Sequence, residues 1–258
     1  MGLGRLRPAA LAAAAIGAVG VAVAISPSAG PATGTPISTA AYGQTSTVGA
    51  LFTRTASGQL SSHFCTASVV NSPAGDLLIT AAHCVAGLNP DQVAFVPDYS
   101  RGQQPYGVWS VSQIITDQQW LSSADPDDDF AFLVVHQPGS KVAIESLTGG
   151  EVLAIGESPG KTVKVAGYPD NQDAAITCLN AALDFSPTQF EFDCAGFTDG
   201  TSGSPLLARS GPLDKVDTVI GVIGGYEKGG STASVSYAAR FGTRMAALYQ
   251  TALAAADR

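Results

Sequence analysis

Residues 77–84 read LLITAAHC. The run Leu77–Thr80 is apolar and β-rich, which predicts a short buried strand ending just before a histidine and a cysteine. Runs of the same kind, broken by Gly, Pro, Asn and Asp, recur at Thr66–Val70, Phe130–Val135, Thr162–Val165 and Val219–Ile223. Short strands at this spacing, with no helices alternating between them, predict an all-β barrel or sandwich.

The C-terminus is the one segment with a helical pattern. Met245, Leu248, Tyr249, Ala252 and Leu253 form an apolar stripe at helical spacing. We expect this helix to dock on the core. The chain shows no internal repeat at the period of a solenoid or a propeller.

Composition and charge exclude several classes of protein. Of the 258 residues, 45% are hydrophobic and only 13% are charged, which argues against a disordered chain and against a coiled coil. Lys plus Arg number 13 and Asp plus Glu 21, giving a net charge of −8. Because a phosphate-binding surface needs the opposite sign, we expect no nucleic acid partner.

The N-terminus has the pattern of a secretory signal peptide. Arg5 and Arg7 precede an Ala-rich apolar run, Ala9–Ile25, which ends in small residues suited to cleavage. We therefore expect residues 1–24 to be removed and the protein to be secreted. A retained membrane anchor is the alternative, but a run of mostly Ala and Gly is weakly hydrophobic. No other stretch could span a bilayer, so no stable membrane association is expected.

A segment rich in Pro, Gly, Ser, Thr and Ala follows. Residues 25–46 read ISPSAGPATGTPISTAAYGQTS and have little apolar periodicity. This composition predicts a linker or short pro-segment. We assign the folded domain to residues 47–258.

Four cysteines accompany the expected export: Cys65, Cys84, Cys178 and Cys194. Four cysteines allow three pairings. Zinc is the alternative use, but no C-x-x-C pair is present. We expect no metal and no cofactor.

Residues 199–206 read DGTSGSPL. The two glycines around Thr201-Ser202 suit a tight turn that exposes the serine hydroxyl and gathers backbone N–H groups on one side. An ordinary surface loop is the alternative. The apolar residues that follow at once indicate that a buried strand holds the turn.

Residues 125–133 read DPDDDFAFL. Asp125, Asp127 and Asp128 are expected to form a solvated loop. Asp129 precedes six apolar residues and should enter the edge of the core, where a carboxylate needs a partner such as an imidazolium. Calcium binding is a weaker alternative, since the run lacks the glycine and distal glutamate of an EF-hand.

Three of these motifs together resemble a known family. The segments Thr80–Cys84, Asp129 before its apolar run, and Gly200–Pro205 resemble the signatures of trypsin/chymotrypsin-like serine proteases. His63-Phe64-Cys65 is similar to the family's strand that carries the disulfide partner of the cysteine after the catalytic histidine. The resemblance runs from about Val48 to the C-terminal helix. Its motifs are most similar to those of bacterial secreted members of the glutamyl-endopeptidase type.

The resemblance implies a fold and roles for individual residues. The fold would be two packed six-stranded antiparallel β-barrels, about 47–140 and 141–240, with a C-terminal helix at about 241–256 and the active site between the barrels. Ser202 would be the nucleophile, His83 the general acid/base and Asp129 the group that orients His83. Backbone N–H groups of Gly200 and Ser202 would form the oxyanion hole. The implied disulfides are Cys65–Cys84 and Cys178–Cys194.

The chain also departs from the family pattern. Thr201 stands where digestive members carry the aspartate that pairs with a newly freed N-terminus, so activation by that ion pair is not expected. Gly224 stands where a serine usually supports the triad aspartate, so support of Asp129 should be incomplete. Neither an acidic nor a basic substrate preference is indicated. The residues expected to bind substrate are Gly196, Phe197, Gly224, Gly225 and Tyr226.

We therefore expect a monomeric, secreted serine endopeptidase that cleaves protein or peptide substrates. A catalytically inactive, protease-like binding protein is the alternative from a different class, and an esterase using the same triad also stays open. His63 and His136, the remaining histidines, are expected to be structural.

Overall fold

The structure is a computed structural model that describes residue 1 and residues 41–42, 45–209 and 217–257. Apart from residue 1, the signal peptide expected over residues 1–24 lies outside the described residues, and so does most of the linker expected over 25–46. Within the described ranges, no helix is long and apolar enough to cross a bilayer.

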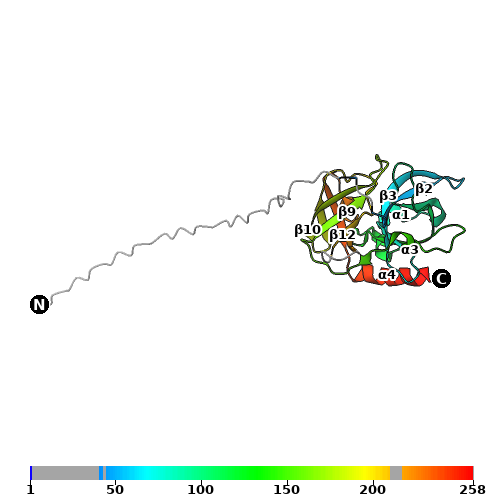
Figure 1. Cartoon of the computed structure of the whole chain (residues 1–258). Helices are drawn as coiled ribbons and strands as arrows, with labels where there is room; N and C mark the ends of the chain where they lie inside the picture. The colour runs from blue at the N-terminus through cyan, green and yellow to red at the C-terminus, as the bar shows by residue number, and fades with distance from the viewer. Residues whose placement is uncertain (2–40, 43–44, 210–216, 258) are drawn as a thin grey trace. The chain divides into compact units, whose positions relative to one another are not determined.

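The first half of the domain is a closed antiparallel barrel with strand order β2-β3-β4-β7-β6-β5. Its strands are β2 (Val48–Arg54), β3 (Leu60–Val70), β4 (Leu77–Thr80), β5 (Val93–Pro97), β6 (Trp109–Thr116) and β7 (Ala131–His136). The second half closes in the order β9-β10-β11-β14-β13-β12, because β9 pairs with both β10 and β12. Its strands are β9 (Thr162–Gly167), β10 (Ile176–Ser186), β11 (Gln189–Asp193), β12 (Pro205–Ala208), β13 (Thr218–Ile223) and β14 (Val235–Arg240). The expected pair of six-stranded barrels is confirmed (Figure 1).

Short elements complete the second barrel and the connections. Two-residue strands β1 (Ala41–Tyr42) and β8 (Val152–Leu153) pair with β10 and β13, so part of the segment expected to be a linker joins the sheet. The connecting helices and 3-10 turns are α1 (Ala82–Val85), η1 (Pro90–Gln92), α2 (Gln118–Ser123), η2 (Pro126–Asp128), α3 (Glu145–Thr148) and η3 (Tyr226–Gly229).

The expected C-terminal helix is α4, Thr243–Ala256. It follows β14 and lies along the bottom of the domain in Figure 1. It packs against β4, β6 and β7 of the first barrel. Met245, Leu248 and Ala252 lie on its buried face, as the apolar stripe predicts. The helix therefore links the end of the chain to the opposite barrel.

Three apolar clusters explain why the core strands read as continuous apolar runs. Leu78 on β4 and Leu133 on β7 point into the first barrel, whereas their neighbours Leu77 and Phe132 belong to a layer that also contains residues of the second barrel and of α4. Both faces of these strands are thus covered, which removes the polar alternation of a half-exposed strand. A third cluster fills the second barrel.

Both disulfides that the resemblance implies are present. Cys65 on β3 is bonded to Cys84 in α1, and Cys178 on β10 is bonded to Cys194 just after β11. The first joins two adjacent segments of the first barrel, and the second lies within the second barrel. Each closes a short loop, with sequence separations of 19 and 16 residues.

Replacing Cys65 and Cys84 together with serine should lower the free energy of unfolding by about 3 kcal/mol, because the unfolded chain regains the entropy of the closed loop. Urea denaturation of the variant and of the wild type measures the difference. The matched control replaces Cys178 and Cys194, whose loop has nearly the same length. A loss below about 1 kcal/mol for both pairs would contradict the entropic account.

Candidate active site

His83 lies in the single helical turn α1, directly after β4. The disulfide from the next residue, Cys84, ties this turn to β3. The side chain of His83 is 14% exposed, and its Nδ1 faces the carboxylate of Asp129 at 2.7 Å. Nδ1 is therefore occupied by Asp129, and Nε2 is the ring nitrogen that could contact a second partner.

Asp129 lies between η2 and β7 and is fully buried. Its Oδ1 accepts a hydrogen bond from the backbone N–H of His83 at 2.8 Å, and its Oδ2 faces His83 Nδ1. Oδ2 also accepts the backbone N–H of Gly225, at 2.8 Å. The sequence suggested incomplete support for Asp129 because Gly224 replaces a serine. The structure differs, since the next residue supplies a backbone donor from the second barrel.

Ser202 lies in the turn of residues 199–204, which precedes β12 and is called the serine turn below. The turn is held by the N–H of Gly203, which donates to Ile223 O at 2.7 Å, and by the carbonyl of Ser202, which accepts from Thr66 N at 2.8 Å. Gly203 has a φ of +85°, and a Cβ there would collide with the Thr66 carbonyl and approach Ala81 N to 3.1 Å. The serine turn therefore lies directly against the segment that carries His83.

The hydroxyl of Ser202 has a partner that the sequence did not indicate. It donates to the carbonyl of Lys228 at 3.4 Å, and in the described part of the chain it makes no hydrogen bond with His83. Lys228 and its neighbour Glu227 both have left-handed backbone conformations, with φ of 55° and 50°. Only the glycines that follow, Gly229 and Gly230, signal this tight turn in the sequence.

A cavity of about 260 Å³ opens beside Ser202. Residues lining it include Phe197, Thr198, Ile223, Lys228, Ser231 and Thr232. Of the five residues expected to bind substrate, Phe197 lies in this wall. Gly196 donates its N–H to Ala233 O at 2.8 Å, next to the cavity.

Of the other three expected substrate residues, two border the acid and the third lies on the surface. Gly224 and Gly225 are buried beside Asp129. Tyr226 is exposed and packs against Phe185 and Tyr237, with ring centroids 5.1 Å apart in both pairs. The segment that follows β13 thus joins the acid of the site to a surface cluster of aromatic rings.

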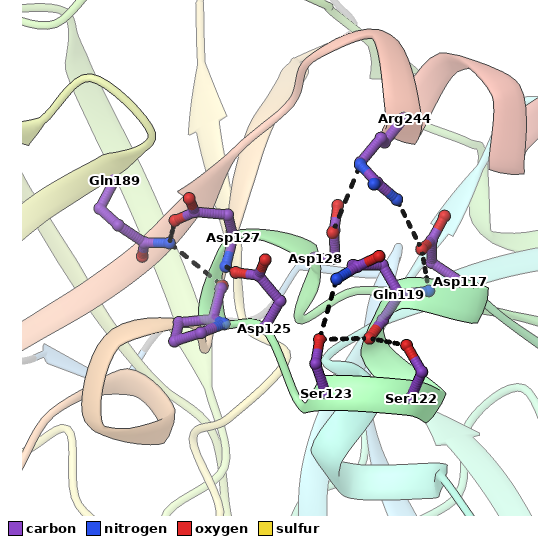
Figure 2. Close-up of polar contacts among 10 residues, drawn as sticks. Asp117, Gln119, Ser122, Ser123, Asp125, Asp127, Asp128, Gln189 and Arg244 are labelled. Carbon is purple, nitrogen blue, oxygen red and sulfur yellow. Dashed lines mark hydrogen bonds and ion pairs between the residues drawn. The ribbon is translucent and has the colours of Figure 1, made fainter.

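The acidic run before Asp129 differs from the solvated loop that the sequence suggests (Figure 2). Asp128 is only 3% exposed, and its Oδ2 lies 3.6 Å from Arg244 Nε. Arg244 also contacts Asp117, at 3.2 Å. The expectation of a solvated residue is therefore wrong for Asp128, because α4 covers this turn and brings a cation to it.

Asp127 contacts a second residue that sequence reasoning missed. Gln189, a buried residue of β11, donates its amide to Asp127 Oδ1 at 2.8 Å and to Pro126 O at 3.1 Å (Figure 2). Its amide oxygen accepts the N–H of Tyr226 at 3.3 Å. Gln189 therefore connects the turn before Asp129 with the segment after β13.

Burial raises the pKa of Asp128 to about 6. The guanidinium of Arg244 acts in the opposite direction, and the carboxylates of Asp117, Asp125 and Asp127 add to the upward shift. The lone ion pair at 3.6 Å does not offset the loss of water around this carboxylate.

The described residues offer little to a metal ion. The one close group of three or more His, Cys and acidic side chains among them is Cys65, His83 and Cys84. Its two sulfurs are joined in a disulfide and are not available as thiolate ligands. The acidic run was the alternative site for calcium. Its carboxylates already contact Gln189, Arg244 and backbone N–H groups.

The other two histidines lie apart from this group. His63 is buried among the rings of Phe52, Tyr99 and Tyr168, and its Nε2 lies 3.1 Å from Gln172 O. His136 is exposed at the end of β7.

The sequence matches the model of the Trypsin family over residues 38–246. No curated protein sequence matches the chain. The fold resembles that of the protease Anisep from Arthrobacter nicotinovorans, with a TM-score of 0.69 and 23% identity over 83% of this chain and 99% of that one.

Two further solved structures share the fold. A thermostable serine protease, AL20, from an extremophilic microorganism gives a TM-score of 0.67 at 23% identity, covering 81% of this chain and 98% of its own. A Glu endopeptidase in complex with MPD gives 0.62 at 15% identity, covering 81% and 91%. At such identities the likeness concerns the fold.

The raised pKa of Asp128 predicts a pH-dependent stability. An aspartate with a pKa of about 6 in the folded state and an ordinary value of 3.8 binds its proton more tightly when folded. Its contribution to stability therefore falls as pH rises from about 4 to about 6 and is constant above.

Asp128→Asn removes this titration. The melting temperature of the variant minus that of the wild type should therefore increase as pH rises from 4 to 6. Thermal unfolding across pH 4–7.5 measures the difference. Asp91→Asn, at an exposed position, is the control. Parallel melting curves for Asp128→Asn and the wild type at every pH would show that Asp128 does not titrate in this range.

Proposed function

We infer that this chain, which belongs to the trypsin family of serine proteases, is a secreted endopeptidase that acts through an acyl-enzyme on Ser202. The observation that carries the proposal is the fully buried carboxylate of Asp129, held 2.7 Å from His83 Nδ1. A buried carboxylate in this position orients the imidazole and stabilises it when it becomes protonated. The serine turn lies against the same segment.

In the proposed mechanism, Nε2 of His83 takes the proton of the Ser202 hydroxyl as the oxygen attacks the scissile carbonyl. The tetrahedral intermediate would place its oxyanion against the N–H groups of Gly200 and Ser202. His83 then donates the proton to the leaving amine, and water hydrolyses the acyl-enzyme by the same steps. Asp129 accepts the hydrogen bond of His83 Nδ1 throughout and so fixes the tautomer of His83.

Before the first step, the Ser202 hydroxyl must leave the carbonyl of Lys228. The contact is long, at 3.4 Å, and a rotation about χ1 of the serine breaks it. Hydrogen bonds of catalytic groups are often poorly aligned without substrate and tighten when it binds. A substrate carbonyl positioned over the turn would favour the rotated hydroxyl.

We propose that the cavity beside Ser202 receives a neutral side chain. Its walls combine the rings and alkyl groups of Phe197 and Ile223 with hydroxyl-bearing residues. The charged residues that line it, Asp199 and Lys228, are both exposed and have opposite signs. Neither sign is buried there to pair with a charged substrate side chain, and an unpaired buried charge is costly.

Secretion is part of the proposal and rests on two features. The N-terminal sequence has the pattern of a signal peptide, and both disulfides are of the kind that persist in oxidising compartments. We propose a monomer acting on proteins or peptides, with no nucleic acid partner.

A catalytically inactive binding protein is the second candidate. The hydrogen bond from Ser202 to Lys228, in place of one to His83, favours it. In that case the serine would stay turned away from the base, and the cleft would bind a peptide without cleaving it. Covalent labelling separates the two, because a fluorophosphonate reacts only with a serine that its base activates.

Wild-type protein should be labelled by a fluorophosphonate at Ser202, and Ser202→Ala should not be. Hydrolysis of a peptide library by Ser202→Ala should fall by several powers of ten, because the nucleophile is absent while the rest of the site remains. Its melting temperature should stay within about 2 °C of the wild type, since the loss is small on the scale of core substitutions. Intact, folded wild-type protein that resists the label would favour the binding protein.

Asp129→Asn should lower kcat/KM on the order of 10³–10⁴-fold, since the amide cannot hold His83 in the required tautomer. Asp127→Asn, two residues earlier, is the matched control and should cost less than about 5-fold, because Asp127 contacts Gln189 and not the imidazole. Steady-state kinetics at equal concentrations of titrated active sites gives the comparison. Equal losses in the two variants would contradict the assigned roles.

A further inference from the structure

Thr66, on β3 of the first barrel, lies under the serine turn of the second barrel and is fully buried. Its hydroxyl donates to the carbonyl of Gly200 at 3.1 Å and accepts the N–H of Tyr168 at 2.9 Å. Its own N–H donates to Ser202 O at 2.8 Å, and its carbonyl accepts the hydroxyl of Thr80 at 2.7 Å. All the hydrogen-bonding groups of this residue are therefore used at one place.

Four consecutive peptide groups of the serine turn have fixed carbonyls. Asp199 O accepts from Asp170 N at 2.8 Å, and Thr201 O accepts from Ser204 N at 3.0 Å. Thr66 fixes the two others, those of Gly200 and Ser202. In a trans peptide the C=O and the N–H point in opposite directions. The N–H groups of Gly200 and Ser202 share their peptide groups with Asp199 O and Thr201 O, so they are directed away from Asp170 and Ser204. The peptide groups that Thr66 fixes are the ones that follow each of these two.

Gly200 packs closely against the end of β9. With a φ of +92°, it adopts a conformation that side chains disfavour, and a Cβ there would lie 2.5 Å from both Asp170 N and Tyr168 O. The hydroxyl of Thr66 joins the same two segments, because it bonds Gly200 and Tyr168 at once. The turn and the end of β9 are thus fixed relative to each other by one side chain.

The buried residue inside the serine turn, Thr201, carries no charge that could fix the conformation of the turn through an ion pair. Thr201 is 2% exposed, and its hydroxyl donates to the carbonyl of Thr198 at 2.7 Å. A buried ammonium group would find no carboxylate at this position, and it would lose its hydration without an ionic partner. Neutral hydrogen bonds must therefore order the turn.

We propose that Thr66 is a positioning residue for the oxyanion hole: it fixes the peptide groups that follow Gly200 and Ser202, and through them it keeps the N–H groups of these two residues directed toward the developing oxyanion. This inference rests on the proposed function. The contact of Thr66 with the serine turn joins the two barrels. The order of the serine turn therefore depends on barrel packing and on the hydroxyl of Thr66. The effect should appear in the transition state more than in substrate binding, because the oxyanion forms only there.

The test compares Thr66→Val, which keeps the shape and removes the hydroxyl, with Thr66→Ser, which keeps the hydroxyl. We expect Thr66→Val to lower kcat 10- to 100-fold with KM changed less than 3-fold, and Thr66→Ser to stay within 3-fold of wild type in both. Inhibition by a peptide aldehyde, which forms a tetrahedral adduct with an oxyanion, should weaken in Thr66→Val by a similar factor. These ranges lie below the loss of a whole oxyanion-hole donor, about 10²–10³.

Thr47→Val is the matched structural control. Thr47 is also a buried threonine, and its hydroxyl donates to Glu151 Oε1 at 2.7 Å, in a contact that involves none of the residues of the site. It should lose stability as Thr66→Val does but keep kcat within 3-fold of wild type. A kcat for Thr66→Val equal to that of Thr47→Val would overturn the proposal.

Two further outcomes are decisive. Should Thr66→Val fail to fold, Thr66→Ala is compared with Thr66→Ser in the same assays, and equal kcat values for alanine and serine overturn the proposal. A folded wild-type protein that neither hydrolyses peptides nor reacts with a fluorophosphonate overturns the proposed function, and the role of Thr66 with it. If the wild type is active and Thr66→Val has the same kcat as the wild type, only the role of Thr66 is overturned.

Discussion

The carboxylate of Asp129 is the group around which the two barrels are arranged. It has no exposed surface, and an unpaired charge in such a place would be strongly destabilising. The backbone and ring of His83 come to it from the first barrel, and the N–H of Gly225 comes from the second. Because these donors belong to both barrels, all three contacts of the carboxylate are formed only when the barrels are packed together.

The apolar layer between the barrels makes that packing possible. It contains side chains of both barrels and of α4, and it gives β4 and β7 a second covered face. Burial on both faces also made these strands predictable, since such strands appear in the sequence as uninterrupted apolar runs. The three site motifs end or begin such runs, which is why His83, Asp129 and Ser202 could be named before the structure. Their joint assignment to a protease, and the pairing of the cysteines, came from resemblance and not from the runs themselves.

What the sequence did not predict depends on contacts between groups that are far apart in the chain. Every residue except proline carries the same N–H donor, so nothing at Gly225 marks it as the group that binds a carboxylate 96 positions away. Burial of Asp128 arises from α4 and Arg244, far along the chain, and the local run of acids suggests solvent instead. The contacts of Thr66 with the serine turn and the left-handed Lys228 are hidden for the same reason.

The site divides into a charged half and a neutral half, and the two should respond differently to solution conditions. His83, Asp129, Asp128 and Arg244 form the charged half, in which burial raises the pKa of Asp128 to about 6 and salt screens the contacts of the exposed Arg244. The serine turn is held by Thr66, Asp170 and Thr201 through hydrogen bonds that involve no ionised side chain. Because such bonds respond little to pH and ionic strength, the serine turn should keep its geometry when the interactions of the charged half change.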